Sequence, residues 1–293
     1  MNARIGILGL GEIGGTAARL LLSEEYAVSA VDRPNATWLV GAGGTLVHDA
    51  ASLAGTCDIV ISALSSEGAV EEAVFGPDGL VAGAHSALTV ADMGTFAIAL
   101  KERVRDALQK NGAVALDTPI SGTAQAMETG RAVIMLSGDE VACETVRTVL
   151  GILAPNTPYV GPFGHGMKLK FVLNALVTNH VLVAAEALNM GIASGLDPQQ
   201  IIDVVKPSVA TSTQFELRGP LIAERKWDDP TAPARLVHKD TRYIVEHAEA
   251  LGVPAPVSTI TRDLYERVAE MGLLEKELSI IFEALAANNT LGK

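Results

Sequence analysis

The stretch that most constrains the fold is Ile5–Gly14 (IGILGLGEIG), an apolar run that leads directly into a G-x-G-x-x-G turn. The residues from Thr16 to Leu22 continue as a helix, and a second predicted strand, Ala27–Val31, ends at Asp32. Glycines in such a turn let the backbone approach a pyrophosphate at the start of the helix. Because a strand precedes the turn, a helix follows it and an acid stands about 20 residues on, the motif predicts a dinucleotide-binding unit.

The cofactor contacts expected from this unit are the turn residues and the end of the second strand: Gly9, Gly11, Glu12, Ile13, Gly14, Asp32 and Arg33. A carboxylate at the end of that strand accepts hydrogen bonds from a ribose 2′-hydroxyl and repels a 2′-phosphate. Asp32 therefore favours NAD as the cofactor. Arg33 could pair with the 2′-phosphate, so NADP stays open.

Strands and helices alternate along the next part of the chain. Predicted strands cover 45–47, 58–64, 87–91, 113–117 and 132–136, and predicted helices cover 49–53, 67–74, 97–111 and 140–150. This alternation predicts a largely parallel sheet with helices on both faces. Ligands bind at the carboxyl ends of strands in such sheets, so the end of the 58–64 strand should face the cofactor.

Proline and glycine cluster between Pro155 and Gly166, and the pattern beyond them is helical. A long helix is predicted over Met167–Ser194, followed by helices at 199–205, 239–251, 257–271 and 277–286. We therefore predict an α/β fold: a Rossmann-type dinucleotide-binding domain over residues 1–162, joined by a long interdomain helix to an all-α substrate and oligomerisation domain over residues 163–293.

Lys170 and Asn174 lie four positions apart on the long predicted helix, so their side chains leave the same face. On an otherwise apolar helix this pair is either a solvated edge or a working pair. Burial among Leu169, Phe171 and Val172 would favour the neutral amine that acid/base chemistry requires.

Composition limits the possible partners. The net charge of −12 argues against a nucleic-acid partner, since phosphate binding needs a basic face. Cys57 and Cys143 lack C-x-x-C spacing, and the six histidines lack H-x-x-x-H or H-E-x-x-H spacing, so no metal site is expected. The chain starts directly with a strand, and its most apolar stretch, 171–185, contains polar side chains. We expect a cytoplasmic protein without a membrane span.

Four segments together resemble the β-hydroxyacid dehydrogenase family, the group of 3-hydroxyisobutyrate dehydrogenase and tartronate semialdehyde reductase. The Gly9–Gly14 turn resembles the cofactor turn of the family, and Asp117–Gly122 its D-x-P-x-S-G substrate segment. Gly164–Asn174 resembles its G-x-G-x-x-x-K-x-x-x-N catalytic segment, and Lys239-Asp240 its C-terminal cofactor contact. The resemblance covers nearly the whole chain. It implies an NAD(P)-dependent oxidoreductase of a short β-hydroxy acid or its semialdehyde.

The resemblance also implies roles for single residues on the substrate side. Lys170 would be the general acid/base, and Asn174 would orient the substrate. Ser121 and Gly122 would bind the substrate carboxylate, with Thr123 next to them. Asp117, before Pro119, is expected to be structural, although a part in the site stays open.

On the cofactor side, the resemblance implies that Leu64 and Thr95 touch the nicotinamide half and that Lys239 closes over the site. The chain departs from the family pattern at Ser65, Gly94, Thr123 and Leu173, where proline, serine, glycine and asparagine are common. These departures leave the substrate, its stereochemistry and the direction of the reaction undetermined.

Two other functions remain open at this stage: an imine reductase-like NADPH enzyme, and a non-catalytic dinucleotide-binding module. Lys170 argues against both, because imine reductases usually lack this lysine and non-catalytic members tend to lose it. The long apolar helix predicts a homodimer or homotetramer joined through the C-terminal helices.

Overall fold

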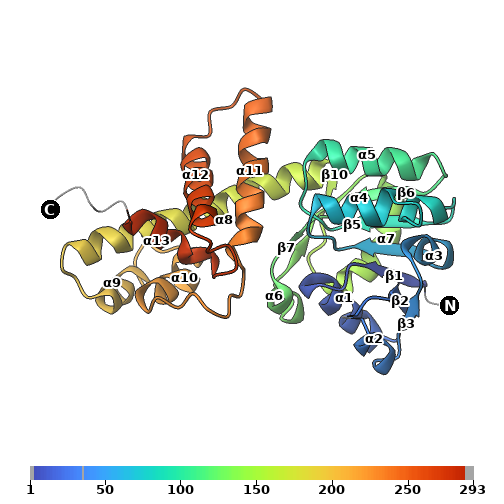
Figure 1. The fold of residues 1–293 in the computed structure, drawn as a ribbon, viewed down its shortest axis with the longest axis horizontal. Helices are drawn as coiled ribbons and strands as arrows, with labels where there is room; N and C mark the ends of the chain where they lie inside the picture. The colour runs from blue at the N-terminus through green and yellow to red at the C-terminus, as the bar shows by residue number, and fades with distance from the viewer. Residues whose placement is uncertain (1–2, 35, 288–293) are drawn as a thin grey trace. The chain divides into compact units, whose positions relative to one another are not determined.

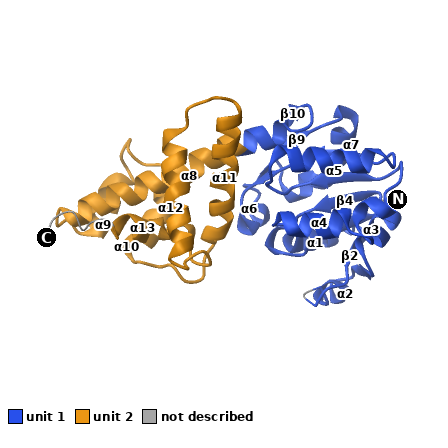
Figure 2. Ribbon diagram, turned by 45° about the horizontal axis from the view of Figure 1, so that its top comes forward, with its two compact units in different colours: residues 1–170 blue, residues 171–293 orange. Residues whose placement is uncertain are grey.

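A computed structural model describes residues 3–34 and 36–287 of the chain. By internal contacts the chain divides into two compact units, residues 1–170 and 171–293 (Figure 2). Every strand found in the described residues belongs to the first unit, and the second unit is helical (Figure 1). The predicted α/β fold with a helical C-terminal region is confirmed.

The main sheet of the first unit has the strand order β10-β9-β6-β5-β4-β1-β2-β3 and is parallel except where β6 meets β9. The order from β3 to β6 is that of a dinucleotide-binding doubly wound sheet. Its strands are β1 (Ile5–Leu8), β2 (Val28–Val31), β3 (Thr45–Val47), β4 (Ile59–Ser62), β5 (Thr89–Asp92), β6 (Val114–Asp117), β9 (Leu136–Ser137) and β10 (Tyr159–Gly161).

Helices cover both faces of this sheet because successive strand residues point to opposite sides. Ile59 and Ile61 belong to the buried cluster under α1 (Glu12–Ser23) and α7 (Glu140–Leu153). Val60 belongs to the other buried cluster, under α3 (Ala50–Thr56), α4 (Glu67–Phe75) and α5 (Ile98–Gln109). A strand buried on both faces is a continuous apolar run, which is why these strands were predictable. Shorter helical segments are α2 (Trp38–Gly41), η1 (Leu80–Gly83) and α6 (Ala124–Glu128).

The predicted single strand over 132–136 is wrong, because the chain changes sheet at Met135. Val133–Ile134 forms β8, which pairs antiparallel with β7 (Ile120–Ser121) in a separate two-stranded sheet. Met135 donates its N–H to the Pro119 carbonyl, and the chain then joins the main sheet as β9. The segment predicted to bind the substrate carboxylate therefore starts from a paired strand.

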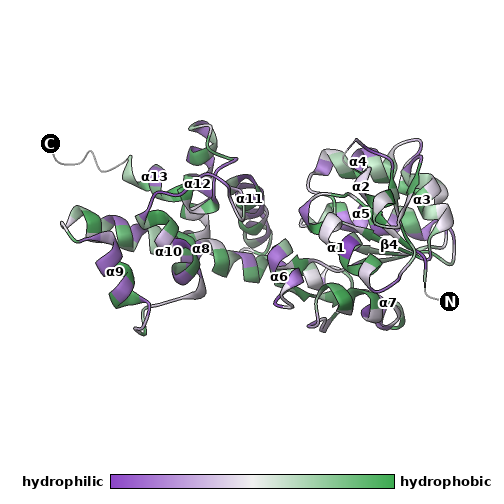
Figure 3. Ribbon diagram, turned by 90° about the horizontal axis from the view of Figure 1, so that it is seen from below, coloured by the Kyte–Doolittle hydropathy of each residue, from purple (hydrophilic) through white to green (hydrophobic). Residues whose placement is uncertain are grey.

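The second unit packs the later turns of α8 (His165–Ala193) with five more helices around one apolar core. These are α9 (Pro198–Val205), α10 (Thr213–Ala223), α11 (Ala234–Ala250), α12 (Pro256–Glu270) and α13 (Ile281–Ala286), with the short η2 (Leu278–Ile280) before the last. Hydrophobic and hydrophilic segments alternate along α9, as expected of a helix with one buried side (Figure 3).

Helix α10 was not predicted, because Gly219 and Pro220 lie inside it. It forms nevertheless, since Ser212 caps its start by accepting the Phe215 N–H at 3.1 Å. Arg218 within it forms a 2.9 Å ion pair with the buried Glu277. Tertiary contacts here outweigh local helix propensity.

By length and composition, α8 is apolar enough to cross a membrane, and it is the only such helix found in the described residues. However, its residues Val181, Leu182, Ala185 and Leu188 are buried in the core of the second unit. These contacts account for the apolar character of one side of α8.

Candidate active site

The glycine turn after β1 has the backbone that a pyrophosphate site requires. Gly9 has a φ of +98°, a conformation that favours glycine. A Cβ at Gly14 would lie 1.8 Å from the Gly9 carbonyl oxygen, so only glycine lets α1 start this close to the turn. A Cβ at Gly11, by contrast, would meet no atom within 4 Å, which leaves the N-terminus of α1 open to an anion. The residues present fit the phosphates of a dinucleotide.

A cavity of about 520 Å³ lies in the first unit at the carboxyl ends of β1 and β2. Four of the residues predicted to bind the cofactor line this cavity: Gly9, Asp32, Arg33 and Leu64. Four further polar residues line the cavity and were not predicted from the sequence: His48, Asp49, Glu72 and Asp78. Asp49 could have been predicted from its position after β3, because ligands bind at the carboxyl ends of such strands.

The charges around this cavity are mainly negative. Four carboxylates line it, from Asp32, Asp49, Glu72 and Asp78. Arg33 Nη2 lies 3.1 Å from Glu72 Oε1, so an acid already holds the one arginine in the lining. This distribution favours ribose hydroxyls over a 2′-phosphate.

A second ion pair in the cavity lining joins His48 and Asp49. His48 Nδ1 lies 3.0 Å from Asp49 Oδ2, while Asp49 Oδ1 accepts the Ser52 N–H at 2.6 Å and caps α3. The hydrogen bonds from Ser52, followed by that from His48, lower the pKa of Asp49 to about 2. Asp49 is therefore anionic at neutral pH, and its hydrogen bond with His48 raises the pKa of the imidazole.

The remaining residues predicted to bind the cofactor lie elsewhere. Gly11, Glu12, Ile13 and Gly14 form the start of α1, next to the cavity-lining part of the turn, and Thr95 follows β5. Gly94, before Thr95, cannot carry a side chain unless a ring moves, because a Cβ there would lie 2.2 Å from Phe96 Cε2. Lys239 belongs to the second unit.

The residues predicted to bind the substrate carboxylate follow β7. Ser121 ends this strand, and Gly122 has a φ of +138°. Thr123 Oγ1 accepts the Ala126 N–H at 3.3 Å and caps α6. Thr123, which stands where the family commonly has its second glycine, therefore caps a short helix.

Lys170 and Asn174 are both buried, with exposed fractions of 8% and 9%, whereas Lys168 is exposed. The burial excludes a solvated edge for this pair on α8. Within the second unit, Asn174 Nδ2 donates a 2.7 Å hydrogen bond to Asp240 Oδ2. Lys239 Nζ lies 3.3 Å from Asp240 Oδ1, so one carboxylate joins two residues that the sequence analysis had singled out separately.

Comparison with known proteins identifies both parts of the chain. Residues 4–161 match the family described as the NAD binding domain of 6-phosphogluconate dehydrogenase. Residues 164–285 match the family described as NAD-binding of NADP-dependent 3-hydroxyisobutyrate dehydrogenase. The chain belongs to the β-hydroxyacid dehydrogenase family. Members of this family are oxidoreductases that use NAD or NADP, which confirms the predicted reaction class and cofactor type.

Similar members of the β-hydroxyacid dehydrogenase family match over most of their length. L-threonate dehydrogenase of Cupriavidus necator is 29% identical over 93% of this chain and 92% of that protein. Glyoxylate/succinic semialdehyde reductase 2, chloroplastic, of Arabidopsis thaliana is 26% identical over 97% of this chain and 79% of that protein. The crystal structure of 3-hydroxyisobutyrate dehydrogenase from Salmonella typhimurium aligns with a TM-score of 0.86 at 25% identity, over 96% of this chain and 99% of that chain.

Imine reductases are more distant from this chain. The imine reductase variant from Myxococcus stipitatus aligns with a TM-score of 0.65 at 16% identity, over 97% of this chain and 100% of that chain. At this identity the likeness shows a shared fold alone. The comparisons thus support a hydroxy-acid oxidoreductase, with imine reductases as more distant neighbours.

Proposed function

We propose that this enzyme transfers a hydride between a nicotinamide cofactor and a short β-hydroxy acid or its semialdehyde, with Lys170 as the general acid/base. The observation that carries the assignment is the burial of Lys170, because Lys168, two residues earlier on the same helix, is exposed. A buried amine is placed to exchange a proton with substrate rather than with water.

In this proposal, each of the site residues has a separate role in the reaction. The cofactor, when bound, supplies or accepts the hydride. Lys170 Nζ removes the hydroxyl proton in oxidation, returns it in reduction and stabilises the developing alkoxide charge. Asn174 holds the substrate without titrating, and backbone N–H groups at Ser121 and Gly122 face the substrate carboxylate. Lys239 contacts the cofactor from the helical region.

We also propose that NAD is preferred to NADP. Asp32 follows β2, where its carboxylate would accept from a ribose 2′-hydroxyl, and Arg33 would have to leave its ion pair with Glu72 to meet a 2′-phosphate. Gly11, Glu12, Ile13 and Gly14 would surround the pyrophosphate, and Leu64 and Thr95 the nicotinamide half. Residues 1–162 would serve cofactor binding, and residues 163–293 substrate binding and assembly.

The test of this function is a steady-state panel of short hydroxy acids and semialdehydes, each with NAD(H) and NADP(H). The names of the relatives direct the choice to 3-hydroxyisobutyrate, L-threonate, glyoxylate and succinic semialdehyde. We expect turnover of at least one β-hydroxy acid or semialdehyde with NAD(H). Tight dinucleotide binding without turnover across the panel would contradict the proposal.

We also propose that the chain assembles into a homodimer or a homotetramer. Exposed apolar side chains recur every seven residues along α8, at Leu169, Leu176, Val183 and Met190. A stripe with this spacing suits the facing helix of a second copy. Light scattering should give the mass of a dimer or tetramer. Leu176→Glu should weaken this association, whereas Val141→Glu, at an exposed position on α7, should not. A monomeric wild-type chain would contradict it. We place this assembly in the cytoplasm, without a nucleic-acid or membrane partner.

A further inference from the structure

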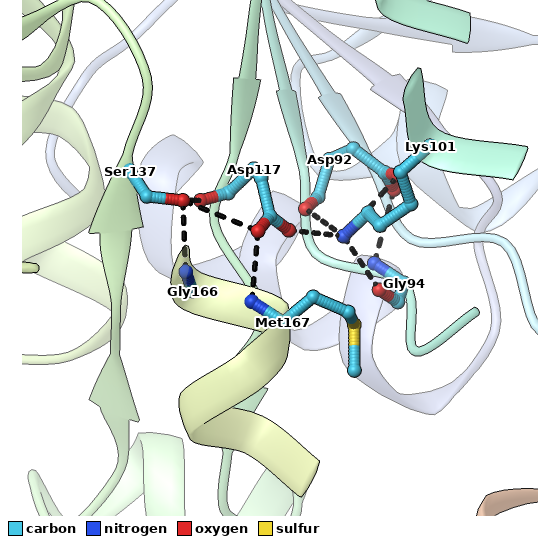
Figure 4. A network of polar contacts seen from close by, with 7 residues as sticks. All are labelled: Asp92, Gly94, Lys101, Asp117, Ser137, Gly166 and Met167. Carbon is cyan, nitrogen blue, oxygen red and sulfur yellow. Dashed lines mark hydrogen bonds and ion pairs between the residues drawn. The ribbon is translucent and has the colours of Figure 1, made fainter. Parts of the chain in front are cut away.

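A lysine that the sequence analysis did not single out lies at the centre of a buried polar network in the first unit. Lys101, on α5, is only 1% exposed. Its Nζ lies 2.6 Å from Asp117 Oδ1 and 3.5 Å from Asp92 Oδ2. It also donates to two carbonyl oxygens, those of Asp92 at 3.2 Å and Gly94 at 2.8 Å (Figure 4). One ammonium therefore holds the ends of β5 and β6 together.

The other oxygen of Asp117 faces the first turn of α8 (Figure 4). Asp117 Oδ2 accepts the Met167 N–H at 2.8 Å. Ser137 Oγ, 3.1 Å from the same carboxylate oxygen, accepts the Gly166 N–H at 2.9 Å. Helix-starting N–H groups lack partners within the helix, so these two buried side chains serve as the cap of α8.

Close packing restricts the same turn further. A Cβ at Gly166 would lie 2.8 Å from Pro119 Cδ and 2.9 Å from the Asp117 carbonyl oxygen. The helix start is thus fixed both by hydrogen bonds and by direct contact with the chain after β6. Lys170 follows Met167 by three positions, less than one turn of about 3.6 residues. A rotation or shift of this turn would move the Lys170 amine with it.

The start of α8 offsets part of the excess negative charge of this network. Two carboxylates, Asp92 and Asp117, face one ammonium, and the N-terminus of a helix carries about half a positive charge. Desolvation lowers the pKa of Lys101, but the carboxylates of Asp117 and Asp92 outweigh it and raise this pKa above 10.5. The contribution of the charged lysine to stability is therefore complete below pH 10.5 and is lost as the pH rises through the folded-state pKa.

We propose that Lys101 and Asp117 are positioning residues that set the place of Lys170 through the first turn of α8. The same network fixes two more segments of the predicted site. Lys101 holds the Asp92–Gly94 turn before Thr95, and Asp117 stands at the head of the segment that reaches Ser121. This inference rests on the proposed role of Lys170 as the acid/base.

The experiment compares Asp117→Ala, Asp117→Asn, Ser137→Ala and Lys101→Met with the wild type, well below each melting temperature. The folded fraction is counted by NADH-binding stoichiometry. We expect kcat to fall by about tenfold to a hundredfold in Asp117→Ala, since small displacements of a reacting group have effects of this size. The substrate KM should change much less than kcat. Asp117→Asn should retain more activity, because an amide oxygen can still accept the Met167 N–H.

A second readout does not depend on turnover. Hydrogen exchange of the peptide that covers residues 165–171 should speed up in Asp117→Ala and Ser137→Ala, because the first-turn N–H groups lose their acceptors. Arg218→Met is the matched control, since Arg218 forms an ion pair with the buried Glu277 in the second unit. This control should lose stability and keep its kcat and its exchange in 165–171.

The outcomes separate this inference from the proposed function. If Lys170→Met keeps normal turnover, the acid/base assignment fails, whatever the variants at Asp117, Ser137 and Lys101 do. If Lys170→Met is inactive while folded Asp117→Ala and Lys101→Met keep wild-type kcat, the positioning role is wrong and the network only stabilises the fold. Unchanged exchange in 165–171 in Asp117→Ala would also overturn the positioning role.

Discussion

Asn174 Nδ2 donates a 2.7 Å hydrogen bond to Asp240 Oδ2, in a part of the second unit where both side chains are buried. The other oxygen of Asp240 lies 3.3 Å from Lys239 Nζ. The carboxylate therefore fixes the orientation of the amide that we propose holds the substrate. It also connects that amide to the lysine proposed to contact the cofactor.

Replacing Asp240 should disturb both partners. A lost buried hydrogen bond to a charged group amounts to about 1.5–3 kcal/mol, so Asp240→Ala should lower kcat/KM by roughly tenfold to a hundredfold. Asp240→Asn is the matched variant, because its amide oxygen can still accept from Asn174 while the charge facing Lys239 is lost. We expect it to affect cofactor affinity more than substrate KM. Equal kinetics for Asp240→Ala and the wild type would show that this carboxylate does not orient Asn174.

The two glycines at the start of α1 should respond differently to alanine. Gly14→Ala places a methyl group against the Gly9 carbonyl oxygen and should reduce the free energy of unfolding by about 3 kcal/mol. Gly11→Ala meets no protein atom, so it should fold normally and weaken NADH binding by blocking the pyrophosphate. Thermal unfolding and fluorescence titration with NADH measure the two effects. Normal NADH affinity in Gly11→Ala would argue against a pyrophosphate at this turn.

Cofactor choice should depend on Asp32 and on the acid that holds Arg33. Asp32→Ser removes an ionised acceptor for the 2′-hydroxyl and should weaken NADH binding about tenfold. Glu72→Gln should improve NADPH binding by at most about fivefold, because exposed ion pairs contribute about 0–1 kcal/mol. Dissociation constants for NADH and NADPH test both variants. A wild-type enzyme that binds NADPH more tightly than NADH would contradict the proposed preference.

Both cysteines should be unreactive in the native protein. Burial raises the pKa of Cys143 to about 11 and also raises the pKa of Cys57. Both thiols therefore stay protonated at pH 8, where only a thiolate reacts rapidly. A disulfide reagent should find no fast thiol at pH 8 and two after unfolding in guanidinium. A fast native thiol would mean that one of these sites opens to solvent.

Local patterns were sufficient for much of the fold and for part of the site. The apolar strands, the glycine turn and the long helix each have a signal within a short stretch of sequence. Lys170 and Asn174 were predictable as a pair because one helix fixes their spacing. The structure adds that both are buried.

The missed features depend on contacts between distant segments. Lys101 stands on an amphipathic helix, where a lysine is normally exposed, and it is buried only because Asp92 and Asp117 end neighbouring strands. Helix α10 contains Pro220, which argues against a helix until Ser212 and the Arg218–Glu277 pair are in place. The apolar run 132–136 gives no indication that the chain leaves one sheet after β8 and enters another at β9.

The kcat of Lys170→Met, measured beside Lys168→Met with the best substrate of the panel, directly tests whether Lys170 is the general acid/base. Both changes remove one ammonium from the same helix, at a buried and an exposed position respectively. General acid/base catalysis contributes about 10²–10⁴-fold, so Lys170→Met should lose activity on that scale and keep its NADH affinity, while Lys168→Met stays near wild type. A kcat for Lys170→Met within about threefold of wild type would contradict the account, since a general acid/base contributes far more than that.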